Sequence, residues 1–162
     1  MKQERLRQLL NVDPCTGILL WRYNHQRPDR IGQRTGWLTD TGYWRVALDG
    51  STYYASQIIW LFVHGQLVGL LDHINRDRSD DRLLNLRPAT KGQNAVNSKM
   101  NSQNTSGYRG VSFCWSTSKW RADIAIDGYR KNLGRFALPE QAHAAWRTAA
   151  IAAFGEEFIN DG

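Results

Sequence analysis

The segment over residues 67–97 constrains the fold most, because its local signals predict one definite order of elements. Apolar residues 67–71 predict a strand that leads into Asp72-His73, and a polar loop follows over residues 75–81. A second extended run begins near residue 85. Thr90-Lys91-Gly92-Gln93 then has the form of a capping box, in which the Thr and Gln side chains each accept a backbone N–H hydrogen bond at the start of a helix. The segment is therefore predicted to fold as strand, loop, strand and helix.

The side chains carried by this segment are those that metal-assisted phosphodiester hydrolysis requires. The carboxylate of Asp72 and the amide oxygen of Asn94 are hard ligands suited to Mg²⁺. His73 can activate water, since an unperturbed histidine with a pKa of about 6.5 is largely neutral and basic at pH 7. An Asp-His pair alone is also common in surface turns, but the combined spacing and the capping box favour a site.

This segment, over residues 56–97, resembles the HNH endonucleases of the phage and intron-homing branch, on Asp72-His73, Asn85-Leu86-Arg87 and Asn94. The resemblance implies a ββα-metal fold in which Asp72 and Asn94 bind one Mg²⁺ or Mn²⁺ ion and His73 is the general base. It also implies that Asn85 holds the loop and orients the imidazole through its amide carbonyl.

Three further polar residues flank these positions. Arg87 and Lys91 are candidates for holding the scissile phosphate, because both are cationic and adjacent to the predicted site. Asn97 lies three residues after Asn94 on the same helical face, so it is the rival metal ligand. We rank it second and expect it to contact DNA or to cap the helix.

The N-terminal region is predicted to be rich in short strands. We expect a helix over residues 4–10, a turn over 13–17, a strand over 18–21 and a polar loop over 24–36. Asp49-Gly50 between two extended runs predicts a hairpin. Ser56 is predicted to cap a helix over residues 57–64 that ends at Gly65. Asp13-Pro14, Thr16-Gly17 and Trp21 also resemble a motif that precedes the HNH core in phage proteins of this type.

Residues 97–106 are polar and mark the predicted domain boundary. We therefore divide the chain into residues 1–98 (with the HNH core over about 56–98), a linker over 99–106 and a second domain over 107–162. Strand-like runs cover 108–115, 119–126 and 129–136, and alanines at helical spacing follow from Pro139 to Gly155. Since Leu138 cannot cap this helix, the missing cap should cost about 1 kcal/mol.

Residues 104–160 resemble the AP2 DNA-binding domain, on Gly107-Tyr108-Arg109-Gly110-Val111, Lys119-Trp120-Arg121-Ala122 and Leu133-Gly134-Arg135-Phe136. The resemblance implies a three-stranded antiparallel sheet that lies in the major groove and is backed by one helix. Strand alternation turns only about half of a strand's residues outward, so each candidate for the DNA face has an ion pair or a core aromatic as its alternative, Trp120 above all. The candidates are Arg109, Trp115, Trp120, Arg121, Arg130 and Arg135.

Composition supports a nucleic-acid partner. The formal net charge is +6 and the pI is about 9.6, as expected for a protein that binds polyanions. The 2 cysteines form no CxxC pair, so a structural zinc site has few ligands. No apolar run is long enough to span a bilayer. We therefore expect a soluble protein of the cytoplasm, which is that of the host cell if the chain is phage-encoded. We expect it to be a monomer or weak dimer that binds double-stranded DNA. Neither a membrane nor a small-molecule cofactor is expected as a partner.

Together these features predict an α+β endonuclease with an HNH cutting module first and an AP2-type DNA reader second. With one active site, a monomer should nick one strand per binding event and leave 5′-phosphate and 3′-hydroxyl ends. Two alternatives stay open: a non-catalytic sequence-specific DNA-binding regulator, and a basic protein that coats nucleic acid without sequence preference.

Overall fold

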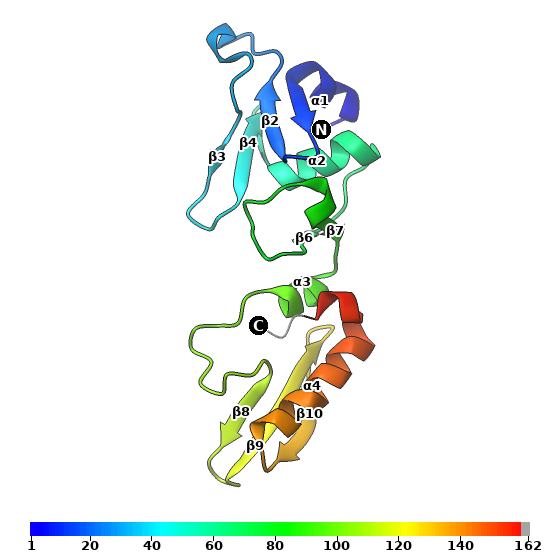
Figure 1. Cartoon of the computed structure of the whole chain (residues 1–162). Coiled ribbons are helices and arrows are strands. Elements are labelled where there is room, and N and C mark those ends of the chain that lie inside the picture. Colours follow the sequence, from blue (N-terminus) through cyan, green and yellow to red (C-terminus); the bar gives the residue numbers. More distant parts are fainter. Residues whose placement is uncertain (160–162) are drawn as a thin grey trace. The chain divides into compact units, whose positions relative to one another are not determined.

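The computed structural model describes residues 1–159, and its contacts divide the chain into two compact units, Met1–Ala89 and Thr90–Gly162 (Figure 1). Both units mix helices with small antiparallel sheets, as the α+β prediction required. The division by contacts falls before the helix that begins the second unit. The predicted linker over residues 99–106 stays a prediction.

The first unit places two helices beside three small sheets. In chain order its elements are α1 (Gln3–Leu9), β1 (Leu10–Asp13), β2 (Ile18–Trp21), β3 (Trp37–Leu38), β4 (Trp44–Leu48), β5 (Ser51–Tyr54), α2 (Ala55–His64), β6 (Leu71–His73) and β7 (Leu86–Pro88), with 3-10 turns at Pro28–Arg30 and Leu83–Asn85. β1 pairs with β2, β4 pairs with both β3 and β5, and β6 pairs with β7, all antiparallel.

Several local predictions for this unit are confirmed. Asp49 and Gly50 have φ values of 48° and 78°, as a two-residue hairpin turn between β4 and β5 requires. Gly65 ends α2 with a φ of 74°. The short strands β1 and β3 were not predicted.

Two predicted element boundaries are wrong. Ser56 does not cap α2, because the helix begins one residue earlier at Ala55 and Ser56 is buried inside its first turn. The strand predicted over residues 67–71 instead covers Leu71–His73, so Asp72 and His73 lie within the strand rather than after it. The β6–β7 backbone hydrogen bonds therefore fix the positions of both residues.

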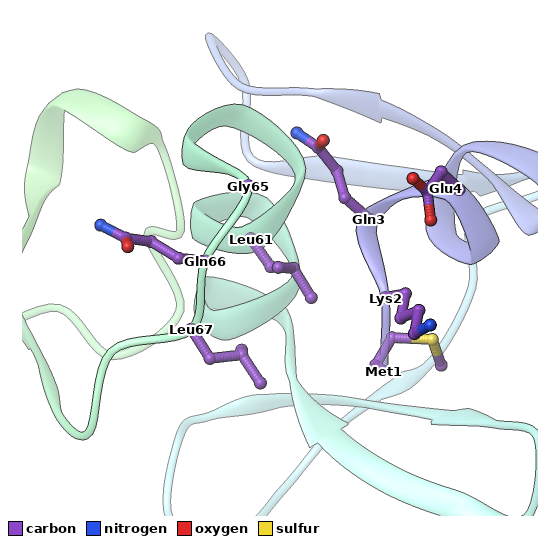
Figure 2. A pocket seen from close by; sticks show the side chains of 8 residues that line it. All are labelled: Met1, Lys2, Gln3, Glu4, Leu61, Gly65, Gln66 and Leu67. Atoms are coloured by element: carbon purple, nitrogen blue, oxygen red, sulfur yellow. The ribbon is translucent and has the colours of Figure 1, made fainter.

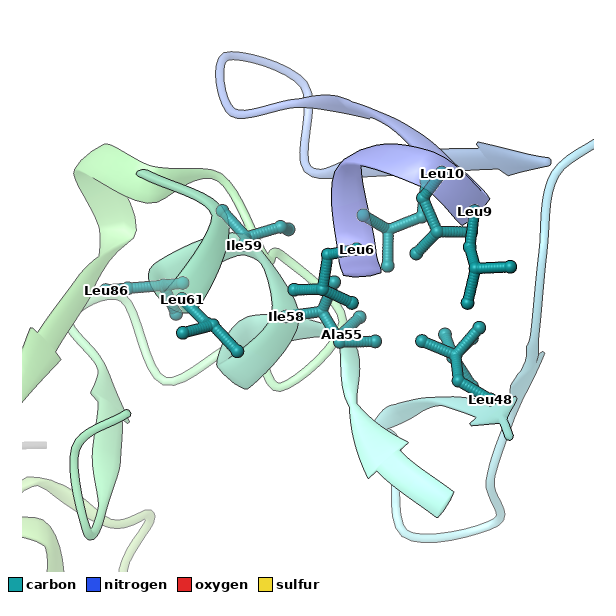
Figure 3. Packing of buried hydrophobic residues seen from close by; sticks show 11 residues of the cluster. Leu6, Leu9, Leu10, Leu48, Ala55, Ile58, Ile59, Leu61 and Leu86 are labelled. Carbon is teal, nitrogen blue, oxygen red and sulfur yellow. The ribbon is translucent and has the colours of Figure 1, made fainter. Parts of the chain in front are cut away.

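The core of the first unit forms where α1 and α2 meet the inner faces of the strands (Figure 3). Leu6 of α1 and Ile59 of α2 are fully buried, together with Val46 of β4 and Leu19 of β2. Leu86 of β7 belongs to the same cluster. The strand pair that carries Asp72 and His73 is thus attached to the main hydrophobic core, which gives the site a rigid support.

The second unit contains the predicted three-stranded sheet and one long helix. Its elements are α3 (Lys91–Asn97), β8 (Val111–Cys114), β9 (Lys119–Ile126), β10 (Tyr129–Phe136), α4 (Pro139–Phe154) and a 3-10 turn at Glu156–Phe158. The strand order is β10-β9-β8, antiparallel throughout, and α4 packs on the sheet. Leu138 precedes α4 without a side-chain cap, as predicted.

Close approach between helix and sheet depends on one glycine. Gly110 has a φ of 69°, and a Cβ placed there would lie 2.1 Å from Cδ1 of Trp146 on α4. Trp146 itself is buried. Only a residue without a side chain fits at this position, so α4 packs directly against the start of β8.

Candidate active site

The two-stranded ribbon of β6 and β7 holds Asp72 in an ion pair. Asp72 lies directly opposite Arg87 in the register, and Nε and Nη2 of Arg87 each lie 2.8 Å from its Oδ2. The Asp72 side chain is 4% exposed and that of Arg87 is 15% exposed. A buried carboxylate is tolerated when a cation compensates its charge, and Arg87 supplies that charge here.

His73, the next residue of β6, is paired with a carboxylate of the following loop. Its Nε2 lies 3.0 Å from Oδ1 of Asp81, and the two side chains are 5% and 4% exposed. An ionised carboxylate can only accept, so in this geometry Nε2 carries a proton, and in the neutral form of the ring Nδ1 carries the lone pair. Burial raises the pKa of Asp81, and the hydrogen bond from His73 opposes that rise. Asp81 thus fixes the orientation of the imidazole and also its tautomer.

Asn85 holds the loop between the two strands. Its amide nitrogen donates to the Asp80 carbonyl at 2.7 Å and to Oδ1 of Asn75 at 3.0 Å, and its Oδ1 accepts from the backbone N–H of Asn75. The Asn85 carbonyl also accepts from the N–H of Ile74 at 2.9 Å. The expected loop-holding role is visible, but its amide carbonyl bonds to the Asn75 backbone, while the imidazole is hydrogen-bonded to Asp81.

The turn over residues 13–17 packs against the loop between β6 and β7. Asp13 organises this turn by accepting from Cys15 and Thr16, and the Pro14 carbonyl accepts from the N–H of Leu83 at 2.8 Å. Gly17 is buried with a φ of 72°, and a Cβ placed there would lie 2.7 Å from the carbonyl carbon of Asp81. The N-terminal turn therefore fixes the backbone that carries Asp81.

Nothing in the sequence distinguishes Asp81 from Asp80 beside it, so its role could not have been found there. Asp80 forms an ion pair with Arg82 at 2.6 Å and its carboxylate accepts from Asn75, which holds its pKa down at about 2. Asp81, in contrast, is turned inward to His73. Two adjacent aspartates thus have different partners, and the conformation of the loop alone decides which of them faces His73.

The other predicted ligands lie on α3 in the second unit. Thr90 and Gln93 form the predicted capping box, with Gln93 N–H donating to Thr90 at 3.2 Å and Thr90 N–H donating to Gln93 at 2.8 Å. Asn94 is half-buried in the first turns, whereas Asn97 is 2% exposed. Lys91 is exposed at the first helical position. The structure thus brings Asp72, His73 and Asn85 together and places the remaining three residues on one helix.

The residues present fit a hard divalent cation of the Mg²⁺ class. Within residues 1–159 no group of three or more His, Cys, Asp or Glu side chains is arranged to hold a metal. Asp72 in the first unit and Asn94 in the second each carry an oxygen donor of the kind that Mg²⁺ accepts, and Mg²⁺ usually keeps several waters beside one or two such protein ligands. Asp72 is buried, and the guanidinium of Arg87 compensates the charge of its carboxylate.

The outer face of the C-terminal sheet, opposite α4, presents arginines. Arg121 pairs with Arg135 and with Ser112 across the strands, and these residues alternate with buried Ala122 and Ile124. Arg130 lies farther along β10 opposite Ala125 and is exposed. The Arg121 side chain contacts Asp123 at 2.7 Å. Three of the predicted DNA contacts therefore share one face.

The remaining C-terminal candidates lie elsewhere. Trp120 packs against the core and has Phe113 at a ring distance of 5.0 Å, which is the core-aromatic alternative. Arg109 donates to the carbonyls of Ala95 and Ser98 at the end of α3, so it has a structural role there. Trp115 is 85% exposed in the turn after β8.

Cys114 on this sheet has an unusually acidic thiol. A hydrogen bond with Ser116, contacts with Thr117 and the nearby Arg135 lower the pKa of Cys114 to about 6. Cys114 lies opposite Lys119 at the end of β8 and is half-buried. The thiolate is thus stabilised mainly by the neighbouring Ser116 and Thr117 hydroxyl groups.

A cavity of about 320 Å³ lies at the junction of α1 and α2 (Figure 2). It is lined by Met1, Lys2, Gln3, Glu4, Leu61, Gly65, Gln66 and Leu67, none of which is a predicted site residue. In the part of the chain that the structure describes, no helix is long and apolar enough to cross a bilayer.

Comparison with known proteins identifies the segment that contains this site. Residues 53–96 match the family model described as HNH endonuclease. The chain is also similar to Protein 3.8 of Escherichia phage T7, with 33% identity over 78 residues that cover 48% of this chain and 64% of the phage protein. No solved structure matches. Residues 53–96, with Asp72, His73, Asn85 and Asn94 among them, are therefore an HNH endonuclease domain.

Proposed function

We propose that this chain is a divalent-metal-dependent DNA endonuclease that nicks one strand per binding event and leaves 5′-phosphate and 3′-hydroxyl ends. The observation that carries the proposal is the buried hydrogen bond between His73 and Asp81, beside the buried carboxylate of Asp72. A stability role does not require a histidine buried against a carboxylate, since buried ion pairs are weak stabilisers. Proton transfer from water does require an oriented, neutral imidazole.

His73 is the general base in this proposal, and Asp81 positions it. With its proton held on Nε2 by Asp81, the neutral imidazole has its basic lone pair on Nδ1, the atom that would accept the proton of water. The imidazolium that forms is stabilised by the same carboxylate. Asn85 keeps the loop in the conformation that carries Asp81.

Asp72 and Asn94 would hold the Mg²⁺ or Mn²⁺ ion, with Asn97 as the rival to Asn94. When bound, such an ion polarises the phosphate and neutralises the leaving 3′-oxygen. Arg87 keeps the Asp72 carboxylate in place, in addition to the proposed contact with the scissile phosphate. Lys91, which is exposed at the start of α3, would supply a second cation for that phosphate.

We further propose that residues 107–162 form an AP2-type module that recognises the DNA target, joined to the nuclease by a linker over 99–106. The order of three antiparallel strands and one helix supports this proposal, as does the row of Arg121, Arg130 and Arg135 on the face away from the helix. Trp115 remains a proposed DNA contact because it is exposed. The phage relative supports a role in the cytoplasm of a host cell.

The decisive test is nicking of supercoiled and fragmented phage-like DNA with Mg²⁺, Mn²⁺ or EDTA. His73→Ala should abolish metal-dependent nicking and leave DNA affinity within a few-fold of wild type. His64→Ala is the matched control, because His64 is an exposed histidine on α2 whose ring contacts that of Trp60 at a centroid distance of 4.1 Å. Equal nicking by His73→Ala and wild type would remove His73 from the chemistry.

The positioning role of Asp81 has its own test. Asp81→Asn can still accept the hydrogen bond but cannot compensate an imidazolium charge, whereas Asp81→Ala can do neither. We expect both variants to lower kcat, Asp81→Ala more, with KM for DNA little changed. A change in KM alone, or equal loss in both variants together with unfolding, would contradict a positioning role. Tight, sequence-specific binding by a wild-type protein that cleaves no DNA would instead favour the non-catalytic regulator.

A further inference from the structure

The outer face of the β3–β4–β5 sheet carries a row of rings and a cation. The register places Trp37 opposite Arg45 and Arg45 opposite Tyr54, so the three side chains lie side by side on the face away from buried Val46. Trp37 is 47% exposed and Tyr54 is 38% exposed. The neighbouring row on this face, Ala47 and Thr52, is uncharged. The sheet thus presents aromatic surface and positive charge without any carboxylate.

The cations of this surface are not neutralised. Arg45 has its guanidinium carbon 5.1 Å from the centre of the Tyr54 ring, and among the described residues its buried Nε has no hydrogen-bond partner. Arg78 lies 5.1 Å from the centre of the Tyr43 ring and donates to the carbonyl of Thr41. Arg5, Arg27 and Arg82 of the same unit instead face carboxylates at 2.8, 2.9 and 2.6 Å. Arg45 and Arg78 therefore keep their positive charge for an external anion.

The surface is continuous with the candidate active site. Tyr43 makes an edge contact with Tyr54 at a ring distance of 5.2 Å and lies 6.0 Å from the His73 imidazole. In Figure 1, the ends of β3 and β4 approach the loop between β6 and β7, which carries Arg78. A chain of rings therefore leads from the sheet to the proposed general base.

We propose that this aromatic–arginine face, formed by Trp37, Tyr43, Arg45, Tyr54 and Arg78, binds the DNA strand next to the scissile phosphate. Arg45 and Arg78 contact its phosphates, and the exposed rings of Trp37 and Tyr54 pack on its sugars and bases. Guanidinium groups that face no carboxylate and lie beside exposed rings can bind a nucleic-acid strand through its phosphates and its bases. The proposal rests on the proposed nuclease function and adds a substrate-binding surface that is separate from the C-terminal sheet.

The test measures DNA affinity in EDTA, where no cleavage occurs, by fluorescence anisotropy over a salt series. Trp37→Ala should weaken binding about 5- to 150-fold, the range for loss of one stacked base. Arg45→Gln should weaken binding and lower the slope of log affinity against log salt by about 1. Tyr23→Ala and Arg27→Gln are matched controls, because Tyr23 is 53% exposed on the same unit and Arg27 is already paired with Asp29.

A second measurement on the wild-type chain removes any dependence on how the variants fold. Photo-crosslinking to DNA that contains bromodeoxyuridine, followed by peptide mapping, should label peptides that contain Trp37 or Tyr54. Wild-type affinity and salt slope in both variants, with crosslinks confined to residues 107–159, would overturn the proposal. The nuclease proposal fails separately: a protein that binds through this face in EDTA but nicks no DNA with Mg²⁺ or Mn²⁺ would refute catalysis and leave the binding surface standing.

Discussion

Gly17→Ala should disable the active site although Gly17 contacts no substrate and no catalytic group. The added Cβ would lie 2.7 Å from the carbonyl carbon of Asp81 and 2.8 Å from the backbone nitrogen of Arg82. Carbon atoms pack at about 3.5–4.0 Å, so the loop must retreat by about 1 Å. The hydrogen bond between Asp81 and His73, 3.0 Å long, would then be stretched beyond a useful length.

Such a displacement should lower the nicking rate about 100-fold, the loss that a 1 Å misplacement in an active site can cause. Loss of general-base assistance altogether would cost at most about 10⁴-fold. Alanine at a φ of 72° should also cost about 1–2 kcal/mol of folding stability. The rate is measured under single-turnover conditions with saturating protein, and stability by urea denaturation.

Gly32→Ala separates the two effects. Gly32 has a φ of 81°, so alanine is similarly strained there, but nothing lies within 4 Å of the added Cβ. We expect Gly32→Ala to lose a similar amount of stability and to keep its nicking rate. Wild-type nicking by Gly17→Ala, or an equal loss in both variants, would show that the turn over residues 13–17 does not position Asp81.

Three other outcomes are expected. Asp72→Asn should destabilise the fold by about 3–5 kcal/mol, because it removes the carboxylate that compensates the largely buried Arg87 charge. The double variant Asp72→Asn with Arg87→Met should recover stability in urea denaturation but should not recover nicking. Recovered nicking would exclude Asp72 as a metal ligand. Asp80, whose pKa is about 2, should stabilise the fold at pH 5 and lose that contribution as pH falls through about 2. In Asp80→Asn the free energy of unfolding should therefore fall less steeply as the pH is lowered. The same fall as in wild type would contradict the lowered pKa of Asp80. In a Cys15→Ser background, alkylation of Cys114 should already be near its maximal rate at pH 7, since its pKa is about 6; a midpoint above pH 8 would contradict the lowered value.

The sequence alone was enough to locate the helix α3 and the C-terminal sheet and helix, because the signals involved are local. Thr90 and Gln93 lie within one helical turn, so their capping box could be recognised and is present. The same holds for Asp49-Gly50 and for Gly155 after α4. The start of β6 was predicted at residue 67 instead of Leu71, because pairing with β7, in which Leu71 lies opposite Pro88, decides where β6 begins.

The partners of the site residues were decided by tertiary structure. Residue type and spacing made His73 and Asp72 candidates, but the path of a loop and the cross-strand register decided their partners Asp81 and Arg87. Alternation could not by itself decide whether Trp120 faces the core, since the face of a strand that is buried depends on where the helix packs. Residue chemistry and local spacing can be read from the sequence. Burial and long-range pairing depend on which distant segments pack together in the fold, as Gly17 packs against the backbone of Asp81.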